Sequence, residues 1–179
     1  MINLHEIPEL KRIDVDAVTY IRPLQSSDAE AVLAILKADS MIRDRVTVAA
    51  KMINLETVEQ EVCSYKASPD LIRYVIVYEN TIVGMISLWS DGGYFEAEPV
   101  PNGYGFGYFL DPTRRGKGII SKTIKKLMIT MQRVADVEAF LAYCEEDNGP
   151  SIAALTSLGF IPTDETFIEP QHNWMERRF

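Results

Sequence analysis

Apolar residues in the first part of the chain recur with spacings that predict one strand and two helices. Residues 17–24 are β-branched and aromatic, so we expect a strand that ends near Pro23. Residues 27–30 (Ser-Asp-Ala-Glu) have the pattern of a capping box, and Asn54 is a typical N-cap, so a helix should follow each of them. Residues 41–53 are helical or irregular. The apolar positions at helical spacing are Val32, Ile35 and Leu36 in the first helix and Leu55, Val58, Val62 and Tyr65 in the second.

The middle of the chain predicts three strands in succession. Residues 71–78 and 82–89 are two strongly apolar runs separated by a short polar turn, which is typical of a β-hairpin. A polar loop rich in Gly and Pro follows, and residues 105–110 then form the third strand. Because Gly105 and Gly107 fall inside that strand, we expect either a bulge or a close approach of a ligand to the backbone.

The last third of the chain predicts two helices and three strands. A long amphipathic helix begins after Gly118, and a strand follows at residues 139–144. A short helix runs from Pro150 to Leu158, and residues 160–168 and 173–179 form two closing strands. The apolar positions of the long helix are Ile120, Ile124, Leu127, Met128 and Met131.

This order of elements predicts the fold class. A strand, two helices, three antiparallel strands, a helix, a strand, a helix and two strands indicate an α+β or mixed α/β fold around a central sheet. A chain of 179 residues suits one domain with a sizeable core, so we expect residues 1–179 to form a single domain.

Composition excludes several classes of function. The net charge of −8, from 26 acidic and 18 basic residues, argues against nucleic acid as a partner and favours cationic substrates. No apolar run is long enough to span a membrane, and the N-terminus lacks the pattern of a signal peptide, so we expect a cytoplasmic protein. Cys63 and Cys144 are too few and too far apart to suggest a disulfide framework or a metal site.

Residues 108–120 (Tyr-Phe-Leu-Asp-Pro-Thr-Arg-Arg-Gly-Lys-Gly-Ile-Ile) carry the candidate binding chemistry. A strand ends at Pro112, a basic glycine turn follows, and a helix begins at once. Gly116 and Gly118 let the backbone approach a bulky anion without a Cβ atom in the way. The free amides and the positive dipole end of the helix then form a phosphate cradle, with Arg114 and other basic residues nearby.

The type of phosphate ligand follows from the motif. The nucleoside-triphosphate loop is absent, and the turn matches only two glycines of the dinucleotide fingerprint. Arg115-Gly-Lys-Gly118-Ile-Ile120 resembles instead the Gln/Arg-x-x-Gly-x-Gly/Ala motif of the GNAT superfamily of acetyl-CoA-dependent N-acetyltransferases. The last motif position, usually Gly or Ala, is Ile120 here.

Other segments resemble one branch of that family. Residues 148–160 (Asn-Gly-Pro-Ser-Ile-Ala-Ala-Leu-Thr-Ser-Leu-Gly-Phe) are similar to the Asn-x-x-Ser…Leu-Gly-Phe segment of the enzymes that acetylate ribosomal-protein N-termini. Residues 7–10, 21–24 and 28–30 resemble the opening of the same branch, in which the last turn position is often larger than Gly. The resemblance covers nearly the whole chain. It implies a mostly antiparallel GNAT sheet of about six to seven strands flanked by helices.

The resemblance also implies how coenzyme A is held. Backbone amides of the turn bind its pyrophosphate, and main-chain groups of Phe109 and Leu110 at the strand end bind the acetyl oxygen and the pantetheine. Asn148 is either a helix cap or a pantetheine ligand, and it can be both. The residues of the turn that are expected to bind the cofactor are Arg115, Gly116, Lys117, Gly118, Ile119 and Ile120.

The acid and the base are open questions at the level of sequence. Many GNAT members carry a tyrosine acid where this chain has Leu155, and in the ribosomal branch a serine matching Ser151 is proposed to serve the leaving thiolate. Ser151 can instead cap the helix that follows it. Glu145 heads an acidic turn near the cofactor and is the candidate base, although a solvated surface charge is the alternative.

We therefore expect an acetyl-CoA-dependent N-acetyltransferase that needs no metal and can form a homodimer. Acidic residues in the loop before the motif strand and in the turn after residue 144 predict attraction of a cationic amine. The resemblance favours a peptide or protein N-terminal amine. The alternatives are a small cationic amine (a polyamine, an aminoglycoside or an amino acid), a non-catalytic acyl-CoA-binding protein of the same fold, or a nucleotide-binding domain.

Overall fold

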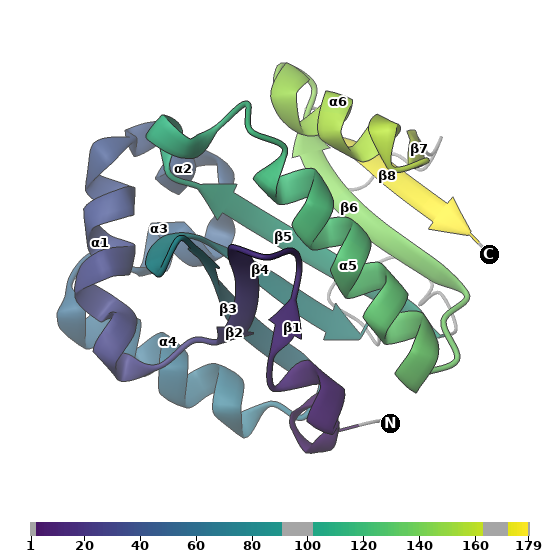
Figure 1. The fold of residues 1–179 in the computed structure, drawn as a ribbon. Coiled ribbons are helices and arrows are strands. Elements are labelled where there is room, and N and C mark those ends of the chain that lie inside the picture. Colours follow the sequence, from purple (N-terminus) through teal and green to yellow (C-terminus); the bar gives the residue numbers. More distant parts are fainter. Residues whose placement is uncertain (1–2, 91–101, 163–171, 179) are drawn as a thin grey trace.

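One eight-stranded sheet, with helices on both faces, organises the residues that the computed structural model describes, which are 3–90, 102–162 and 172–178 (Figure 1). The strand order is β1-β2-β3-β4-β5-β6-β8-β7. Neighbouring strands are antiparallel except β5 and β6, which are parallel. The strands are β1 (Ile13–Asp14), β2 (Thr19–Pro23), β3 (Leu71–Tyr78), β4 (Thr81–Ser90), β5 (Gly103–Leu110), β6 (Ala139–Glu145), β7 (Ile161–Pro162) and β8 (His172–Arg178).

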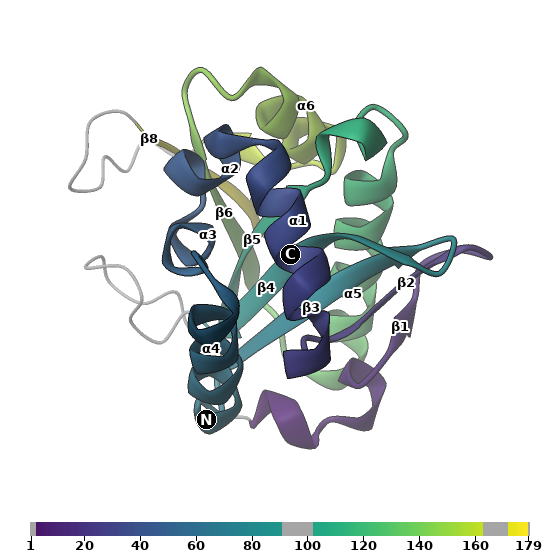
Figure 2. The same ribbon diagram turned by 90° about the vertical axis from the view of Figure 1, so that its left-hand side faces the viewer.

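The helices cover the two faces of this sheet unequally. Figure 2 shows α1 and α4 on one side of the sheet and α5 on the other. α2 and α3 are short and continue from α1, while α6 follows β6. The α-helices are α1 (Ala29–Ala38), α2 (Ser40–Arg45), α3 (Thr47–Lys51), α4 (Leu55–Ala67), α5 (Ile119–Val134) and α6 (Gly149–Ser157).

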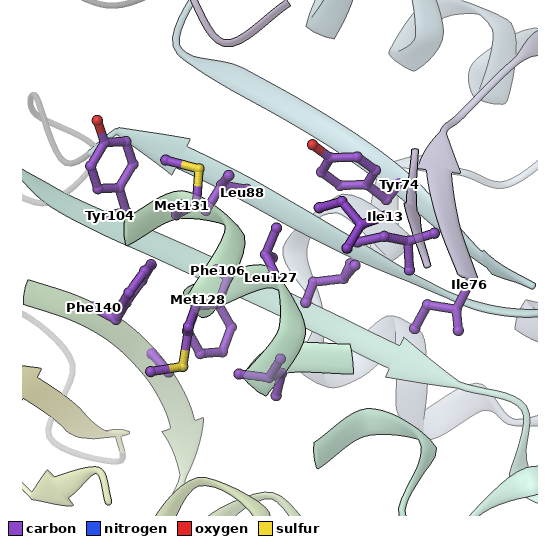
Figure 3. Close-up of a cluster of buried hydrophobic side chains, with 14 of the residues drawn as sticks. Ile13, Tyr74, Ile76, Leu88, Tyr104, Phe106, Leu127, Met128, Met131 and Phe140 are labelled. Carbon is purple, nitrogen blue, oxygen red and sulfur yellow. The ribbon is translucent and has the colours of Figure 1, made fainter. Parts of the chain in front are cut away.

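The core between α5 and the sheet is built from the predicted apolar stripe. Leu127, Met128 and Met131 of α5 are buried against aromatic side chains of β5 and β6 (Figure 3). Phe106 packs edge-on against Phe160, with ring centroids 5.6 Å apart. Burial of apolar area on this scale is the main stabilising term of the domain. It also fixes the N-terminal end of α5 against the end of β5.

The second core lies on the other face, beneath α1 and α4. It contains the apolar positions predicted for these helices, including Val32 and Leu36 of α1 and Val58 and Val62 of α4. Asn54 caps α4 as predicted, because its side chain accepts a hydrogen bond from the Thr57 amide at 2.9 Å. The expected fold class is thus confirmed, with six strands of five or more residues and two of only two residues.

One local prediction was wrong, and one of the two alternatives given for the glycines of β5 is excluded. The capping box before α1 is formed by Gln25 and Asp28 rather than by Ser27 and Glu30, because a 3-10 turn (Ser26–Asp28) precedes the helix. The bulge expected in β5 is absent from its pairing with β4, which runs without a break. The register shift lies between Ile76 and Val77 of β3 instead.

The closing strands differ in extent from the prediction. Where residues 160–168 were expected to form a strand, the described part contains only β7, and residues 163–171 lie outside the described residues. β8 pairs with β6 along its whole length, from Ala139↔Arg178 to Glu145↔His172. No helix among the described residues has the length and apolar character needed to cross a membrane.

Candidate active site

The site begins where β5 and β6 part. The two strands are paired from Gly103↔Ala139 to Phe106↔Ala142 and no further. Beyond that point β5 continues to Leu110 beside β4, and β6 continues to Glu145 beside β8. A wedge therefore opens between the strand ends, and the backbone groups of β5 that face it have no neighbouring strand to bind. This edge presents main-chain donors and acceptors to a ligand.

The glycine turn closes one end of the wedge. Gly116 and Gly118 have φ angles of 75° and 72°, which L side chains rarely adopt. A Cβ atom built at either position meets nothing within 4 Å, so both glycines face open space. Gly118 is the N-cap of α5 and has no side chain to satisfy the first amides of the helix. These amides and the helix dipole suit the phosphate groups of a cofactor.

Arg115 ties the glycine turn to the N-terminal end of α2. Its Nη2 atom donates to Asp39 Oδ2 at 2.6 Å and to the Leu110 carbonyl at 3.2 Å. Asp39 is also the N-cap of α2 and accepts from the Met41 amide. The arginine side chain thus holds the end of β5 and the start of α2 together.

The first turn of α6 faces β5 across the wedge. Asn148 caps the helix by accepting a hydrogen bond from the Ser151 amide at 3.3 Å. Because Asn148 is the cap, the Ser151 hydroxyl is available for another contact. It lies 2.6 Å from the Tyr108 hydroxyl, and either oxygen can be the donor. Burial raises the pKa of the Tyr108 phenol to about 12, against the smaller lowering effect of the Ser151 hydrogen bond.

The acidic turn after β6 is tied to α2 by a single arginine. Arg45 Nη2 donates to Asp147 Oδ2 at 2.9 Å, and Arg45 Nε lies 3.1 Å from Glu145 Oε2 without hydrogen-bond alignment. Both carboxylates are therefore next to one guanidinium. The turn presents less uncompensated negative charge than the sequence suggests.

Trp89 of β4 lies over the glycines of β5. A Cβ atom built at Gly105 would be 2.2 Å from Trp89 Nε1, whereas at Gly107 the nearest atom of the same ring is 3.7 Å away. Gly105 is thus needed to make room for the indole. Gly107 has ordinary space around it. Crowding within the sheet therefore accounts for Gly105.

A cavity of about 1190 Å³ joins these features. We divide it into two sides. The turn side is formed by residues 107–121 and the start of α6. The α2–α3 side is formed by residues 39–51 and by Leu71, Arg73, Ser87 and Trp89 of β3 and β4. Glu145 of β6 lies between them.

The structure brings most predicted site residues to this cavity. Glu145, Asn148 and Ser151 line it together with the turn, and Lys117 is the exception, since it is exposed and is not among the lining residues. Phe109 and Leu110 bury their side chains in opposite cores, so they offer only main-chain groups. The lining residues predicted from the sequence are Phe109, Leu110, Arg115, Gly116, Gly118, Ile119, Ile120, Glu145, Asn148 and Ser151.

Two other positions resolve earlier alternatives. Leu155 is fully buried in the core beneath α5, so no acid stands where other family members place a tyrosine. Cys144 is buried in the same core and also lines the cavity, and burial raises the pKa of its thiol. A protonated, buried thiol fits a role in core packing better than a role as a nucleophile.

Sequence reasoning missed four side chains of the site. Tyr108 continues the alternation of glycine and aromatic residues along its strand and therefore resembles a core position. Asp39 and Arg45 flank a segment whose helices the pattern did not place, and their partners are 76 and 102 residues away. Trp89 could have been suspected from the glycines opposite it in the next strand.

Comparison with known proteins identifies the family. The family model described as an acetyltransferase (GNAT) domain matches residues 19–161, which is most of the chain. The chain belongs to the GNAT acetyltransferase family. The predicted resemblance is therefore confirmed.

Several relatives of this GNAT chain act on ribosomal proteins according to their names. Ribosomal-protein-serine acetyltransferase of Escherichia coli is 28% identical over 88 residues, which are 49% of this chain and 46% of that protein. The match thus spans about half the length of that curated relative. A coenzyme A complex of RimL, a ribosomal α-N-protein acetyltransferase, has a TM-score of 0.77 at 21% identity and covers 93% of this chain and 97% of its own.

A third relative is named for a different role. The microcin self-immunity acetyltransferase MccE, solved with acetyl-CoA and AMP, has a TM-score of 0.74 at 17% identity. The alignment covers 92% of this chain and 94% of that one. At these identities the likeness to solved structures is one of fold, and it does not decide the acceptor.

Proposed function

We propose that this protein is an acetyl-CoA-dependent N-acetyltransferase whose acceptor is the α-amino group of a peptide or protein. The observation that carries the proposal is the wedge between β5 and β6, which opens beside the glycine turn at the start of α5. Free main-chain groups and a helix N-terminus suit a pantetheine arm and a pyrophosphate, respectively. The family membership and the names of the relatives support the same reaction.

In the proposed reaction, the neutral amine attacks the thioester carbon. A C–N bond forms, the C–S bond breaks, and the amine loses one proton. Main-chain amides at the end of β5 would stabilise the negative charge on the thioester oxygen, as in an oxyanion hole. Ser151 at the start of α6 would donate a hydrogen bond to the leaving sulfur. We assign the cofactor phosphates to the backbone of residues 115–120.

Glu145 is the proposed acceptor for the amine proton. It lies at the end of β6, between the two sides of the cavity. Arg45 Nε lies 3.1 Å from Oε2 of this carboxylate, which would accept the proton directly or through water. An α-amine with an ordinary pKa near ~8 is far more often neutral at pH 7.5 than a lysine at ~10.4, by about 100-fold. A site with a modest base therefore favours α-amines.

An acceptor panel with purified protein tests this function. It would compare a lysine-free peptide with a free N-terminus, the same peptide with a blocked N-terminus and one lysine, and a polyamine. Release of free coenzyme A measures turnover in each case. We expect kcat/KM for the free α-amine to exceed that for the lysine peptide by at least about 10-fold.

Other outcomes would identify the rival functions. Faster acetylation of the polyamine would assign the protein to small cationic amines. Tight binding of acetyl-CoA in calorimetry, with no turnover of any amine, would support a non-catalytic acyl-CoA-binding protein. Absence of binding would contradict the cofactor assignment itself.

A further inference from the structure

The contact between Tyr108 and Ser151 joins two hydroxyl groups inside the wedge. Their oxygens are 2.6 Å apart and come from β5 and from the first turn of α6, 43 residues away in sequence. Both residues line the cavity. No sequence motif links them. Their contact depends on the parting of β6 from β5, since α6 follows β6 and returns over the open end of the wedge.

Each partner is held independently of the other. The Tyr108 ring stacks on Phe106, with centroids 6.4 Å apart and an angle of 26° between the planes. The Ser151 backbone is fixed by the Asn148 cap. Two hydroxyls held in this way have little rotational freedom left beyond the choice of which one donates.

That choice decides what Ser151 can do. A hydroxyl has one proton, so a serine that donates to Tyr108 has none left for a ligand. If Tyr108 donates instead, the Ser151 proton is free to point into the wedge. A phenol is the stronger acid of the two and hence the better donor. Each hydrogen bond in such a chain strengthens the next by polarisation.

We propose that Tyr108 is a positioning residue that donates its hydroxyl proton to Ser151 Oγ and thereby directs the Ser151 proton to the sulfur of coenzyme A. This role deepens the proposed acetyl transfer and rests on it. The chain Tyr108 O–H···Ser151 O–H···S⁻ stabilises the leaving thiolate by hydrogen bonding. No proton needs to be transferred to the sulfur, so atoms and charges balance when the C–S bond breaks. Many GNAT members have a tyrosine acid where this chain has Leu155, and the Tyr108–Ser151 pair takes over that role here.

The protonation state of Tyr108 fits this role. Burial raises the pKa of the phenol to about 12, so it remains a donor throughout the physiological range. Cys144 is a titratable neighbour that contributes to the raised pKa of Tyr108, and burial raises the pKa of its own thiol as well. A role as a phenolate base would instead need the pKa of Tyr108 to be lowered.

The decisive experiment measures the thiol pKa of coenzyme A bound to the protein, which requires no acceptor. The thiolate absorbs in the near ultraviolet, and a difference spectrum against the complex with a desulfo analogue removes the contribution of Cys144. Ser151→Ala removes the hydrogen bond to the thiolate and should raise this pKa by about one unit, whereas Tyr108→Phe removes only the group that orients Ser151 and should raise it by a smaller, measurable amount. The expected rise in the double variant is that of Ser151→Ala alone.

Turnover supplies a second readout. Ser151→Ala should lower kcat about 10- to 100-fold and Tyr108→Phe about 5- to 10-fold, with KM values little changed. The double variant should match Ser151→Ala within about twofold, because Tyr108 acts only through the serine. Ser151→Thr keeps the hydroxyl and should retain most of the activity. The kcat of the parent protein should not rise between pH 9 and about pH 10.5, since the phenol does not ionise there.

These outcomes separate the positioning role from the proposed function. If coenzyme A does not bind, the proposed function and this role both fail. If it binds with the same thiol pKa in the parent and in Tyr108→Phe, only the positioning role is overturned. Multiplicative effects of the two substitutions on kcat would likewise overturn it, because Tyr108 would then contribute by packing alone.

Discussion

The two sides of the cavity are built in different ways. Apart from the start of α6, the turn side comes from one continuous segment, in which a strand end, a glycine turn and a helix start follow each other between residues 107 and 121. The α2–α3 side is assembled from residues 39–51 and from two strands that come later in the chain. Arg45 and Arg115 join these sides through partners 102 and 76 residues away.

This difference has a physical reason. A phosphate cradle needs only backbone amides and a helix dipole, and a short local sequence supplies both. An acceptor surface needs side chains of particular shape and charge on several elements. In the proposed reaction, coenzyme A would lie on the turn side of the cavity and the acceptor on the α2–α3 side. Substitutions on each side should have separable effects.

The largest effect is expected on the turn side, from Gly118→Asp. The carboxylate would lie against the cofactor pyrophosphate, and repulsion of about 2–3 kcal/mol should weaken coenzyme A binding about 100-fold. Gly118→Asn is the matched control, because asparagine has the same size, is neutral and tolerates positive φ. It should cost only a few-fold in affinity. Calorimetric affinities that are equal for the aspartate variant and the parent protein would contradict the cradle.

A smaller effect is expected from Gly105→Ala on the α2–α3 side. Its Cβ atom would lie 2.2 Å from Trp89 Nε1, so the indole must move. Such overpacking should lower the free energy of unfolding by about 1–3 kcal/mol and raise KM for the acceptor, with unchanged affinity for coenzyme A.

Gly107→Ala is the control on the same face of the same strand. Its Cβ atom would lie 3.7 Å from the indole, which is an ordinary contact. We expect a change of less than about 1 kcal/mol in urea unfolding. Equal destabilisation by both alanines would show that Trp89 does not set the requirement for glycine.

The smallest effect is expected from Arg45→Met, which keeps the stem of the side chain and removes the guanidinium. Glu145 and Asp147 then lose their common cationic neighbour, and the acidic turn can attract cations. At low salt, kcat/KM should rise about 3- to 10-fold for a cationic peptide relative to a neutral peptide of the same length. The preference should fade as salt is added, because exposed charges are screened. A preference that does not depend on salt would count against the electrostatic explanation.

The fold was largely predictable from the spacing of apolar residues. The stripe of Ile124, Leu127, Met128 and Met131 predicted the face that α5 buries, and two apolar runs predicted β3 and β4. The start of α1 was mispredicted. Ser27 and Glu30 satisfy the capping-box pattern, but Asp28 is drawn into a two-fold contact with Arg22 at 2.7 Å and caps from there. The capping-box pattern of Ser27 and Glu30 is therefore not realised, because Asp28 forms the ion pair with Arg22 and the cap with Gln25 instead.

The sequence by itself determined the elements, the glycine turn and the family, because these depend on spacing within short segments and on residue types with few alternative uses. Only the tertiary structure decided which side chains meet in the wedge. In the sequence, Tyr108 resembles a core residue, but in the fold α6 places Ser151 beside its hydroxyl. Glu145 resembles a free surface charge in the sequence, but in the fold α2 places Arg45 beside it. Contacts between residues far apart in the chain follow from how the layers pack, and no local pattern in the sequence records them.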